Sequence, residues 1–136
     1  SKKQKMSKSV YVPSMEYITV DDFDSVPKYM KGRITYNNVN NAIDELNKAY
    51  KEKYKILGMK PSQLNDVNRK RYETYKQLET KDTVAEYFIV DGDVKEFCNF
   101  KLDRVGRNVL TILRHCGRMK EIRGNGRTRY AIVHVY

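Results

Sequence analysis

The amino-acid sequence predicts a mostly helical α+β domain that ends in a β-hairpin. Apolar residues recur at helical spacing over residues 39–57 and again over 105–116, which indicates two amphipathic helices. A four-residue apolar run at 87–90 is typical of a short buried strand. Residues 127–136 alternate regularly and follow Gly124-Asn125-Gly126, and Asn-Gly favours a tight turn because both residues accept positive φ angles.

Length, cysteine content and charge limit the class of protein. The 136 residues correspond to one domain, which can form a core without disulfides or metals. There are only two cysteines, Cys98 and Cys116, and no apolar run approaches the roughly 20 residues of a membrane helix. We therefore expect an intracellular domain, and the start at Ser1 suggests a piece of a longer protein. The 27 basic and 17 acidic residues give a net charge of +10, which points to a polyanionic partner.

The N-terminal residues differ in composition from the rest of the chain. Residues 1–9 are polar and basic and have no periodicity, so we expect residues 1–20 to form a basic flexible linker or tail. Residues 21–136 are expected to form the folded domain. Two short β-prone runs, at 10–12 and 17–20, are separated by Pro13 and are expected to lie as extended segments on that domain.

Two helices are predicted in the first half of the domain. The first follows Thr35, can end at Gly58, and has an apolar stripe of Val39, Ala42, Ile43, Leu46, Ala49, Tyr50, Ile56 and Leu57. The second begins near Asn65, after a break at Pro61, and its apolar side carries Val67, Tyr72, Tyr75 and Leu78. Both helices are additions to the elements that follow.

The second half combines a strand, two helices and the hairpin. After the strand at 87–90, Asp93 and Glu96 have capping-box spacing, which predicts a short helix through Phe97. A longer helix is expected over 103–116, with an apolar face of Val105, Val109, Ile112, Leu113 and Cys116. A short helix, a longer helix and a hairpin are the ordered parts of a winged helix. The predicted fold is therefore a variant winged helix with extra helices, in which the hairpin is the wing.

Most of the positive charge lies near the C-terminus. Residues 104–136 carry eight basic residues and one acidic residue, Glu121, whereas residues 81–103 carry three basic and six acidic residues. Arginine predominates, and its guanidinium can bind a carboxylate or phosphate through two hydrogen bonds. The arginines of the helix and hairpin are Arg104, Arg107, Arg114, Arg118, Arg123, Arg127 and Arg129. We expect this region to bind a polyanion, and DNA, RNA and acidic protein tails are all compatible with it.

The sequence has no pattern typical of an enzyme. It contains neither a glycine-rich phosphate loop with its lysine nor a GxSxG nucleophile motif. His115 and Cys116 are adjacent, so on a helix they point in different directions, and no second ligand pair accompanies them. We therefore predict no catalytic activity, no metal site and no cofactor.

The same elements leave open a second function, a winged-helix DNA-binding domain. Residues 104–116 would then form the recognition helix and the hairpin the wing. Arg107, Asn108 and Arg114 could reach base edges, since arginine and asparagine commonly read guanine and adenine. Weak, unselective nucleic-acid binding is expected of any domain with a charge of +10, so only sequence-selective binding would favour this alternative.

Several co-linear motifs resemble a known family. They are FDSVPKYMKGR at 23–33, ETKDT at 79–83, YFIV at 87–90, DVKEF at 93–97, ILRHC at 112–116, EIRG at 121–124 and TRY at 128–130. These motifs extend over most of the chain, from about residue 22 to residue 132. They resemble the microtubule-binding domain of the first subunit of the spindle and kinetochore-associated (Ska) complex.

The resemblance implies a variant winged helix that binds tubulin polymer and couples chromosomes to dynamic spindle microtubules in mitosis. It implies a location at kinetochores and spindle microtubules, an isolated domain that is monomeric, and assembly with the other Ska subunits through a region absent here. The contacts that it implies are basic residues on more than one face: Arg33, Lys95, Lys101, Arg104, Arg114 and Arg123. The chain departs from the family pattern at Val84, Val105 and Gly117, where basic residues are common.

Overall fold

The computed structural model describes residues 11–134, which contain six α-helices and a three-stranded antiparallel sheet. The helices are α2 (Val20–Asp24), α3 (Lys28–Lys31), α4 (Tyr36–Leu57), α5 (Asp66–Leu78), α6 (Asp91–Phe97) and α7 (Arg104–His115). The strands are β1 (Phe88–Ile89), β2 (Met119–Gly124) and β3 (Arg127–Ile132). The mostly helical α+β class is thus confirmed, while the winged-helix assignment stays a prediction.

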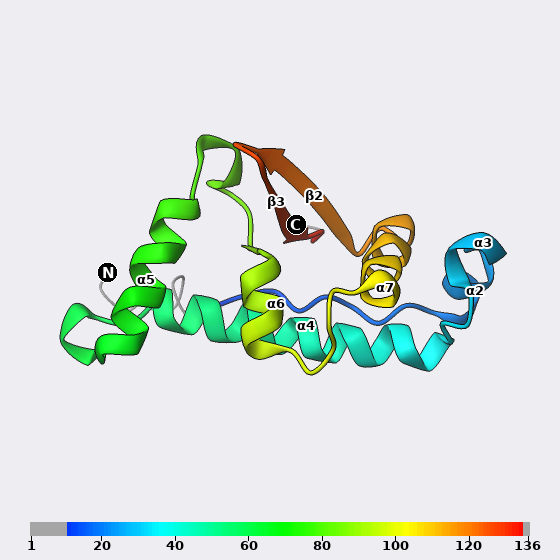
Figure 1. The fold of residues 1–136 in the computed structure, drawn as a ribbon, viewed down its shortest axis with the longest axis horizontal. Helices are drawn as coiled ribbons and strands as arrows, with labels where there is room; N and C mark the ends of the chain where they lie inside the picture. Colours follow the sequence, from blue (N-terminus) through cyan, green and yellow to red (C-terminus); the bar gives the residue numbers. More distant parts are fainter. Residues whose placement is uncertain (1–10, 135–136) are drawn as a thin grey trace.

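The long helix α4 forms the base on which the other elements rest (Figure 1). Thr35 and Asn38 cap its start reciprocally, since each side chain accepts a hydrogen bond from the other residue's backbone N–H. The predicted stripe from Val39 to Ile56 is buried, and the helix ends at Gly58. Most of this stripe lies in the main core, whereas Ile56 packs in a smaller cluster with Leu64 and Tyr75.

The first part of the described chain is more ordered than the sequence suggested. Met15 and Ile18 are buried in the main core. On α4, the side chain of Asn47 accepts a hydrogen bond from the backbone N–H of Met15 and donates one to its carbonyl. Asn40, two helical turns earlier, forms the same two hydrogen bonds with Ile18, and all four distances are 2.8–3.3 Å. The segment therefore runs antiparallel along α4 (Figure 1). The packed structure begins before residue 21, where the domain was expected to start, and the 17–20 run ends in α2. Residues 1–10 of the expected tail lie outside the described residues.

Strand β3 is the centre of the sheet, because the strand order is β1-β3-β2. The predicted short strand pairs with the predicted hairpin, through Phe88 opposite Ala131 and Ile89 opposite Tyr130. The hairpin turn is confirmed, with Asn125 at φ 55° and Gly126 at φ 70°. Because β3 has a neighbour on each edge and packed residues on both faces, residues 129–132 are buried without alternation.

Three local predictions were wrong. Helix α6 begins at Asp91, not at Asp93; Asp93 is its third residue and accepts a hydrogen bond from Val90 N–H over 2.9 Å. Val67 and Val105 are exposed, although both were assigned to apolar faces. On α7 the predicted Val109, Ile112 and Leu113 are buried, but the face also includes Gly106 and Leu110 in place of Val105, because this side of the helix packs against α3 and α4.

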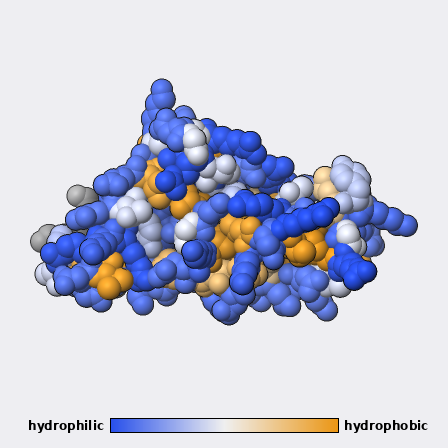
Figure 2. Space-filling view, in the orientation of Figure 1, coloured by the Kyte–Doolittle hydropathy of each residue, from blue (hydrophilic) through white to orange (hydrophobic). Residues whose placement is uncertain are grey.

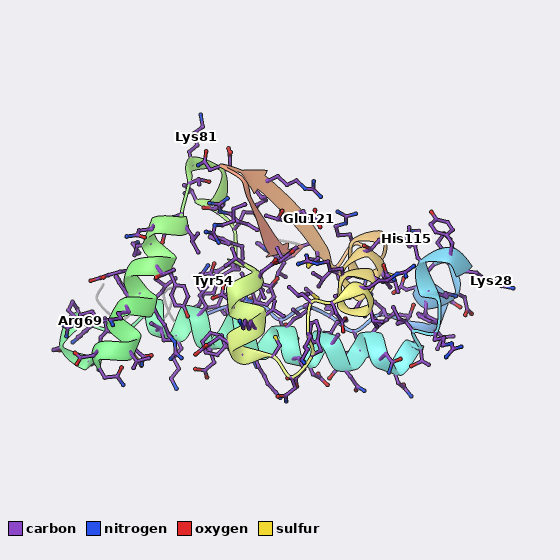
Figure 3. All side chains as sticks on the ribbon, in the orientation of Figure 1. Lys28, Tyr54, Arg69, Lys81, His115 and Glu121 are labelled. Atoms are coloured by element: carbon purple, nitrogen blue, oxygen red, sulfur yellow. The ribbon has the colours of Figure 1, made fainter. Side chains whose placement is uncertain are left out.

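The surface is largely hydrophilic on the face drawn in Figure 2, with hydrophobic atoms visible between the elements. No helix within residues 11–134 is long and apolar enough to cross a membrane. Basic residues lie far apart on the molecule: Lys81 is at the upper tip beside the sheet, Lys28 is at the right-hand end on α3, and Arg69 is at the left-hand end on α5 (Figure 3). Cations of this fold are therefore presented in several directions.

Candidate functional site

The ten basic residues predicted to bind the partner have three different environments. Five are exposed and have no carboxylate within 4 Å among residues 11–134; these are Arg33, Lys95, Lys101, Arg104 and Arg127. Four are paired with carboxylates, namely Arg107, Arg114, Arg118 and Arg123. The last, Arg129, is buried. The structure thus does not bring the ten residues together into one patch.

The five exposed cations belong to different parts of the chain. Arg33 precedes α4, Lys95 is on α6, Lys101 is in the loop before α7, Arg104 is the first residue of α7, and Arg127 is the first residue of β3. Exposed cations that are not held in a close ion pair can attract an external polyanion. This arrangement provides many weak contacts, which is different from a deep binding pocket.

Glycine at position 106 fixes the loop that carries Lys101. A Cβ atom at Gly106 would lie 1.9 Å from the backbone oxygen of Lys101, so no other residue fits without displacing the loop. The carboxylate of Asp103 accepts from Gly106 N–H over 2.9 Å and caps the first turn of α7. Lys101 and Arg104 are consequently presented from a closely packed junction.

One carboxylate joins two of the predicted arginines. Glu121 Oε2 on β2 lies 2.9 Å from Arg114 Nη1 on α7. The same oxygen accepts hydrogen bonds from Arg123 Nη2 and Nε over 3.0 and 3.2 Å. We call these three residues the arginine bracket. Figure 3 shows Glu121 on the outer strand of the sheet, on the side of α7.

A second carboxylate holds the arginine in the middle of α7. Asp91 Oδ2 accepts from Arg107 Nη2 over 3.1 Å, and this hydrogen bond raises the pKa of Arg107. The other oxygen of Asp91 accepts from the hydroxyl of Tyr130 over 2.7 Å. Burial, with this hydrogen bond, raises the pKa of Tyr130 to about 12. Arg107 is thereby tied to the central strand through one carboxylate.

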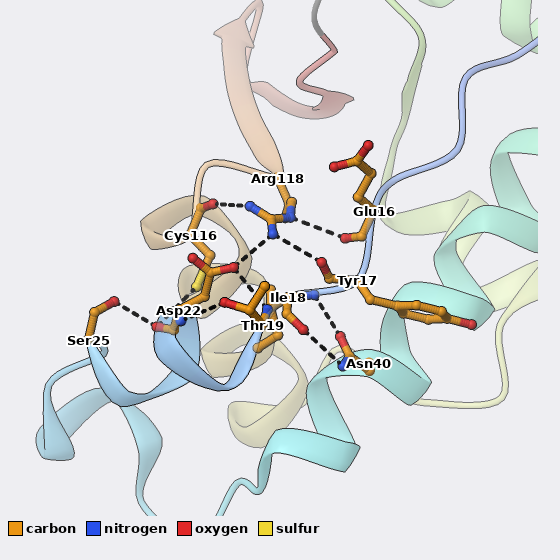
Figure 4. Close-up of polar contacts among 9 residues, drawn as sticks. All are labelled: Glu16, Tyr17, Ile18, Thr19, Asp22, Ser25, Asn40, Cys116 and Arg118. Carbon is orange, nitrogen blue, oxygen red and sulfur yellow. Dashed lines mark hydrogen bonds and ion pairs between the residues drawn. The ribbon is translucent and has the colours of Figure 1, made fainter.

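Arg118 was predicted to bind the partner, but its guanidinium is used inside the fold (Figure 4). It donates to the carbonyls of Glu16, Tyr17 and Cys116 over 2.8–3.2 Å and to Asp22 Oδ2 over 2.8 Å. A hydrogen bond from the Thr19 backbone, together with Arg118, lowers the pKa of Asp22. Arg118 therefore links residues 16–22 to the end of α7. This geometry gives no support to its prediction as a binding residue.

Arg129 was also predicted to bind the partner, but the structure buries it within the fold. Its Nε donates to the carbonyl of Leu78 over 3.0 Å, and its Nη1 to that of Gly124 over 3.3 Å. The Leu78 carbonyl belongs to the last residue of α5, where helical carbonyls lack internal partners. Nothing in the sequence indicated that the end of α5 would lie beside Arg129, because these residues are 51 positions apart in the chain.

Lys53 is the charged residue that the sequence analysis missed. It is 1% exposed, donates to the carbonyl of Phe88 over 2.8 Å, and its Nζ lies 3.5 Å from the centroid of the Phe88 ring. Burial lowers its pKa to about 8. Its position three residues after Tyr50 and three before Ile56 places it on the apolar stripe, and this spacing was the available signal.

The cysteines occupy sheltered positions. The Cys98 thiol lies 3.3 Å from the carbonyl of Glu45, and burial raises its pKa to about 12. Burial also raises the pKa of Cys116, next to exposed His115. These shifts keep both thiols protonated at neutral pH. Among residues 11–134, no group of three or more His, Cys, Asp or Glu side chains is placed to hold a metal ion.

Comparison with known proteins assigns the chain to a family. A family model described as spindle and kinetochore-associated protein 1 matches residues 1–126. "SKA complex subunit 1" of Xenopus tropicalis is 50% identical over 129 residues, which cover 95% of this chain and 51% of that protein. The protein of the same name from Homo sapiens is 49% identical over 121 residues, covering 89% of this chain and 48% of the relative.

A more distant relative extends the similarity to plants. "SKA complex subunit 1 homolog" of Arabidopsis thaliana is 30% identical over 112 residues, which cover 82% of this chain and 41% of that protein. The chain therefore spans about half the length of the curated relatives that it matches. The residues that the family model matches include every described helix and strand before β3. The chain belongs to the spindle and kinetochore-associated protein 1 family.

Proposed function

We propose that this domain is a non-enzymatic microtubule-binding module of a kinetochore-associated complex. It would contact the acidic surface of tubulin through distributed arginines and lysines and so couple chromosomes to dynamic spindle microtubules in mitosis. One observation carries the proposal: five exposed cations with no carboxylate within 4 Å among residues 11–134 lie on five parts of a fold that belongs to this family. The contact set is Arg33, Lys95, Lys101, Arg104 and Arg127, with Arg114, Arg123 and Arg107 held by carboxylates beside it.

Coulomb attraction is sufficient to drive this association. The net charge of +10 attracts an acidic lattice before contact, and at physiological ionic strength the interaction acts over about 8 Å. Each exposed ion pair contributes about 0–1 kcal/mol, so affinity requires several pairs at once. Many weak contacts, with no deeply buried anchor, would let the module remain attached while individual contacts break and re-form.

The names of the relatives suggest the setting in which the module acts. They are called subunits of the SKA complex, so we propose that other subunits of that complex bind a part of the protein outside this chain. We also propose that the isolated domain is monomeric and that the protein is located at kinetochores and spindle microtubules. These proposals rest on membership of the family, and no contact within residues 11–134 is used to support them.

Co-sedimentation with taxol-stabilised microtubules tests the function. We expect the combined Arg33→Ala and Lys101→Ala variant to weaken binding roughly five- to tenfold, because two exposed contacts are lost. The matched control is Lys51→Ala with Lys55→Ala, which removes the same charge from exposed positions on α4. Equal losses in both variants would mean that net charge alone, without defined contacts, drives binding. Absence of pelleting by the unaltered chain at low salt would refute the proposal.

The nucleic-acid alternative has less support from the geometry. Two of its three proposed base-reading residues, Arg107 and Arg114, are paired with Asp91 and Glu121. In each pair the carboxylate takes up an N–H donor that a bidentate contact with a base edge could use. Binding to microtubules and to mixed duplex DNA at one salt concentration separates the two functions, and tight sequence-selective DNA binding would favour the alternative.

A further inference from the structure

The arginine bracket has an uneven exposure that is informative. The Glu121 side chain is 17% exposed, whereas those of Arg114 and Arg123 are 40% and 74% exposed. The acid is therefore sheltered beneath two cations that face the solvent. Each guanidinium has five N–H donors, and the bracket uses only one or two nitrogens of each, so both retain donors for an external ligand.

Rigid elements fix the bracket. Glu121 and Arg123 are two residues apart on β2, so their side chains lie on one face of the sheet. Gly117, at φ 70°, turns the chain at the end of α7, which lets β2 run back beside its last turn and Arg114. The strand is paired with β3 along its whole length. The three side chains consequently meet on a scaffold that holds their backbones in place.

Without a carboxylate between them, two neighbouring guanidiniums would repel each other and sample many rotamers. Ordering a long side chain at an interface costs about 0.5–1.5 kcal/mol, and a side chain that is already ordered avoids that cost on binding. A carboxylate shared by both guanidiniums reduces their repulsion and orders their side chains, but it lowers the net charge by one. The arrangement therefore gives up one positive charge and keeps the two arginine side chains ordered.

We propose that Glu121 is a positioning residue, which holds Arg114 and Arg123 as a preformed pair that binds carboxylates of an acidic protein partner. The inference rests on the proposed function, since that partner surface would be tubulin. Two converging guanidiniums suit carboxylate side chains, because each can form parallel N–H to oxygen hydrogen bonds. Glu121 itself demonstrates that one carboxylate oxygen can lie within hydrogen-bond distance of both arginines.

Positioning and net charge predict opposite effects for Glu121→Gln. The substitution raises the net charge by one, so Coulomb attraction alone predicts tighter microtubule binding. Positioning predicts weaker binding, by about fivefold, because two side chains must then be ordered on contact. The matched control is Glu73→Gln on α5, which adds the same charge at an exposed glutamate that forms no ion pair within residues 11–134. We expect Glu73→Gln to bind as well as the unaltered chain or slightly better.

A second background separates positioning from damage to the fold. In a chain that already carries Arg114→Ala and Arg123→Ala, Glu121 has neither of these guanidiniums to hold. There, Glu121→Gln is expected to leave binding unchanged or to tighten it. Weaker binding in both backgrounds would indicate a structural role and overturn the proposal, as would a Glu121→Gln variant that binds as tightly as Glu73→Gln.

A measurement without tubulin makes the inference independent of the proposed function. NMR relaxation of the Arg123 Nε–H group reports how ordered that guanidinium is on the ps–ns timescale. We expect an ordered group in the unaltered chain, a mobile one in Glu121→Gln, and no change in Glu73→Gln. Equal mobility in all three chains would overturn positioning by Glu121. If the mobility changes as expected but the unaltered chain does not bind microtubules, the result counts against the proposed function alone.

Discussion

The ammonium group of Lys53 and the carbonyl of Phe88 form a buried hydrogen bond of 2.8 Å between α4 and the first strand of the sheet. The rings of Tyr54 and Tyr75 lie 5.2 and 5.5 Å from the same ammonium, in addition to that of Phe88. No carboxylate lies within 4 Å of Lys53 among residues 11–134. The charge is stabilised by aromatic faces and one carbonyl, which only partly replace water.

This environment gives the stability of the fold an unusual dependence on pH. Folded Lys53 loses its proton near pH 8, while an unfolded lysine keeps it to about pH 10.5. Between these values the unfolded state binds more protons, so stability rises with pH. We expect the free energy of unfolding in urea, taken relative to that of a chain without this lysine, to increase by about 1 kcal/mol from pH 7 to pH 9.

Lys53→Met is the control for this pH dependence, because it keeps the length of the side chain without the charge. Its free energy of unfolding should fall slightly over the same interval, because unfolded cysteines begin to ionise there while buried Cys98 and Cys116 stay protonated. The interval ends at pH 9 because Tyr130, whose folded pKa is raised, lowers the stability of both chains at higher pH. A rise of equal size in the methionine variant would show that Lys53 is not its source.

Arg129 and Arg127 should separate stability from binding. Arg129→Met leaves the Leu78 carbonyl at the end of α5 without its donor, and we expect it to lower the free energy of unfolding by about 2 kcal/mol. Arg127→Met, two residues earlier at an exposed position, should leave stability within about 0.5 kcal/mol and weaken microtubule binding. Urea unfolding and co-sedimentation of both variants check this, and the reverse pattern would contradict the assignment of Arg129 to the fold.

The contrast between these two arginines shows what sequence patterns can and cannot predict. Local periodicity predicts α4 because Val39 to Ile56 repeat along one helix, and it predicts the turn at Asn125 and Gly126. It does not show which elements meet. The burial of Arg129 depends on α5 and β1, which are distant in the chain, so an alternation rule that assumes one solvent-facing side fails there.

The same reason limits prediction of the candidate site. Arginine content and spacing identify the exposed residues of the candidate site, such as Arg104, because their position does not depend on contacts with distant parts of the chain. Arg118 fails because its acceptors are Glu16, Tyr17 and Asp22, about 100 residues earlier. The shared carboxylate of Glu121 was visible in the sequence only as the single acid among eight basic residues, and its role depends on the packing of β2 against α7.

Loss of the Arg118 side chain should weaken the packing of residues 16–22 without unfolding the domain. Arg118→Ala removes donors from the carbonyls of Glu16 and Tyr17 and an ion pair from Asp22. We expect faster amide hydrogen exchange over residues 16–22, while the core of α4 keeps its protection. Microtubule affinity should fall by less than twofold, since Arg118 has no place in the contact set. A large loss of affinity with unchanged exchange would restore it as a binding residue.

Gly106→Ala is expected to damage the junction that presents Lys101 and Arg104. The added Cβ would lie 1.9 Å from the Lys101 backbone oxygen, so the loop before α7 must move or the helix must shift. Overpacking of this kind costs about 1–3 kcal/mol, and we expect a lower midpoint of urea unfolding together with weaker microtubule binding. Gly92→Ala on α6 is the matched control, because nothing lies within 4 Å of its Cβ. A better helix former there should leave binding unchanged and stability equal or higher. If the two alanine variants unfold at the same urea concentration, the contact between Gly106 and the loop does not constrain the fold.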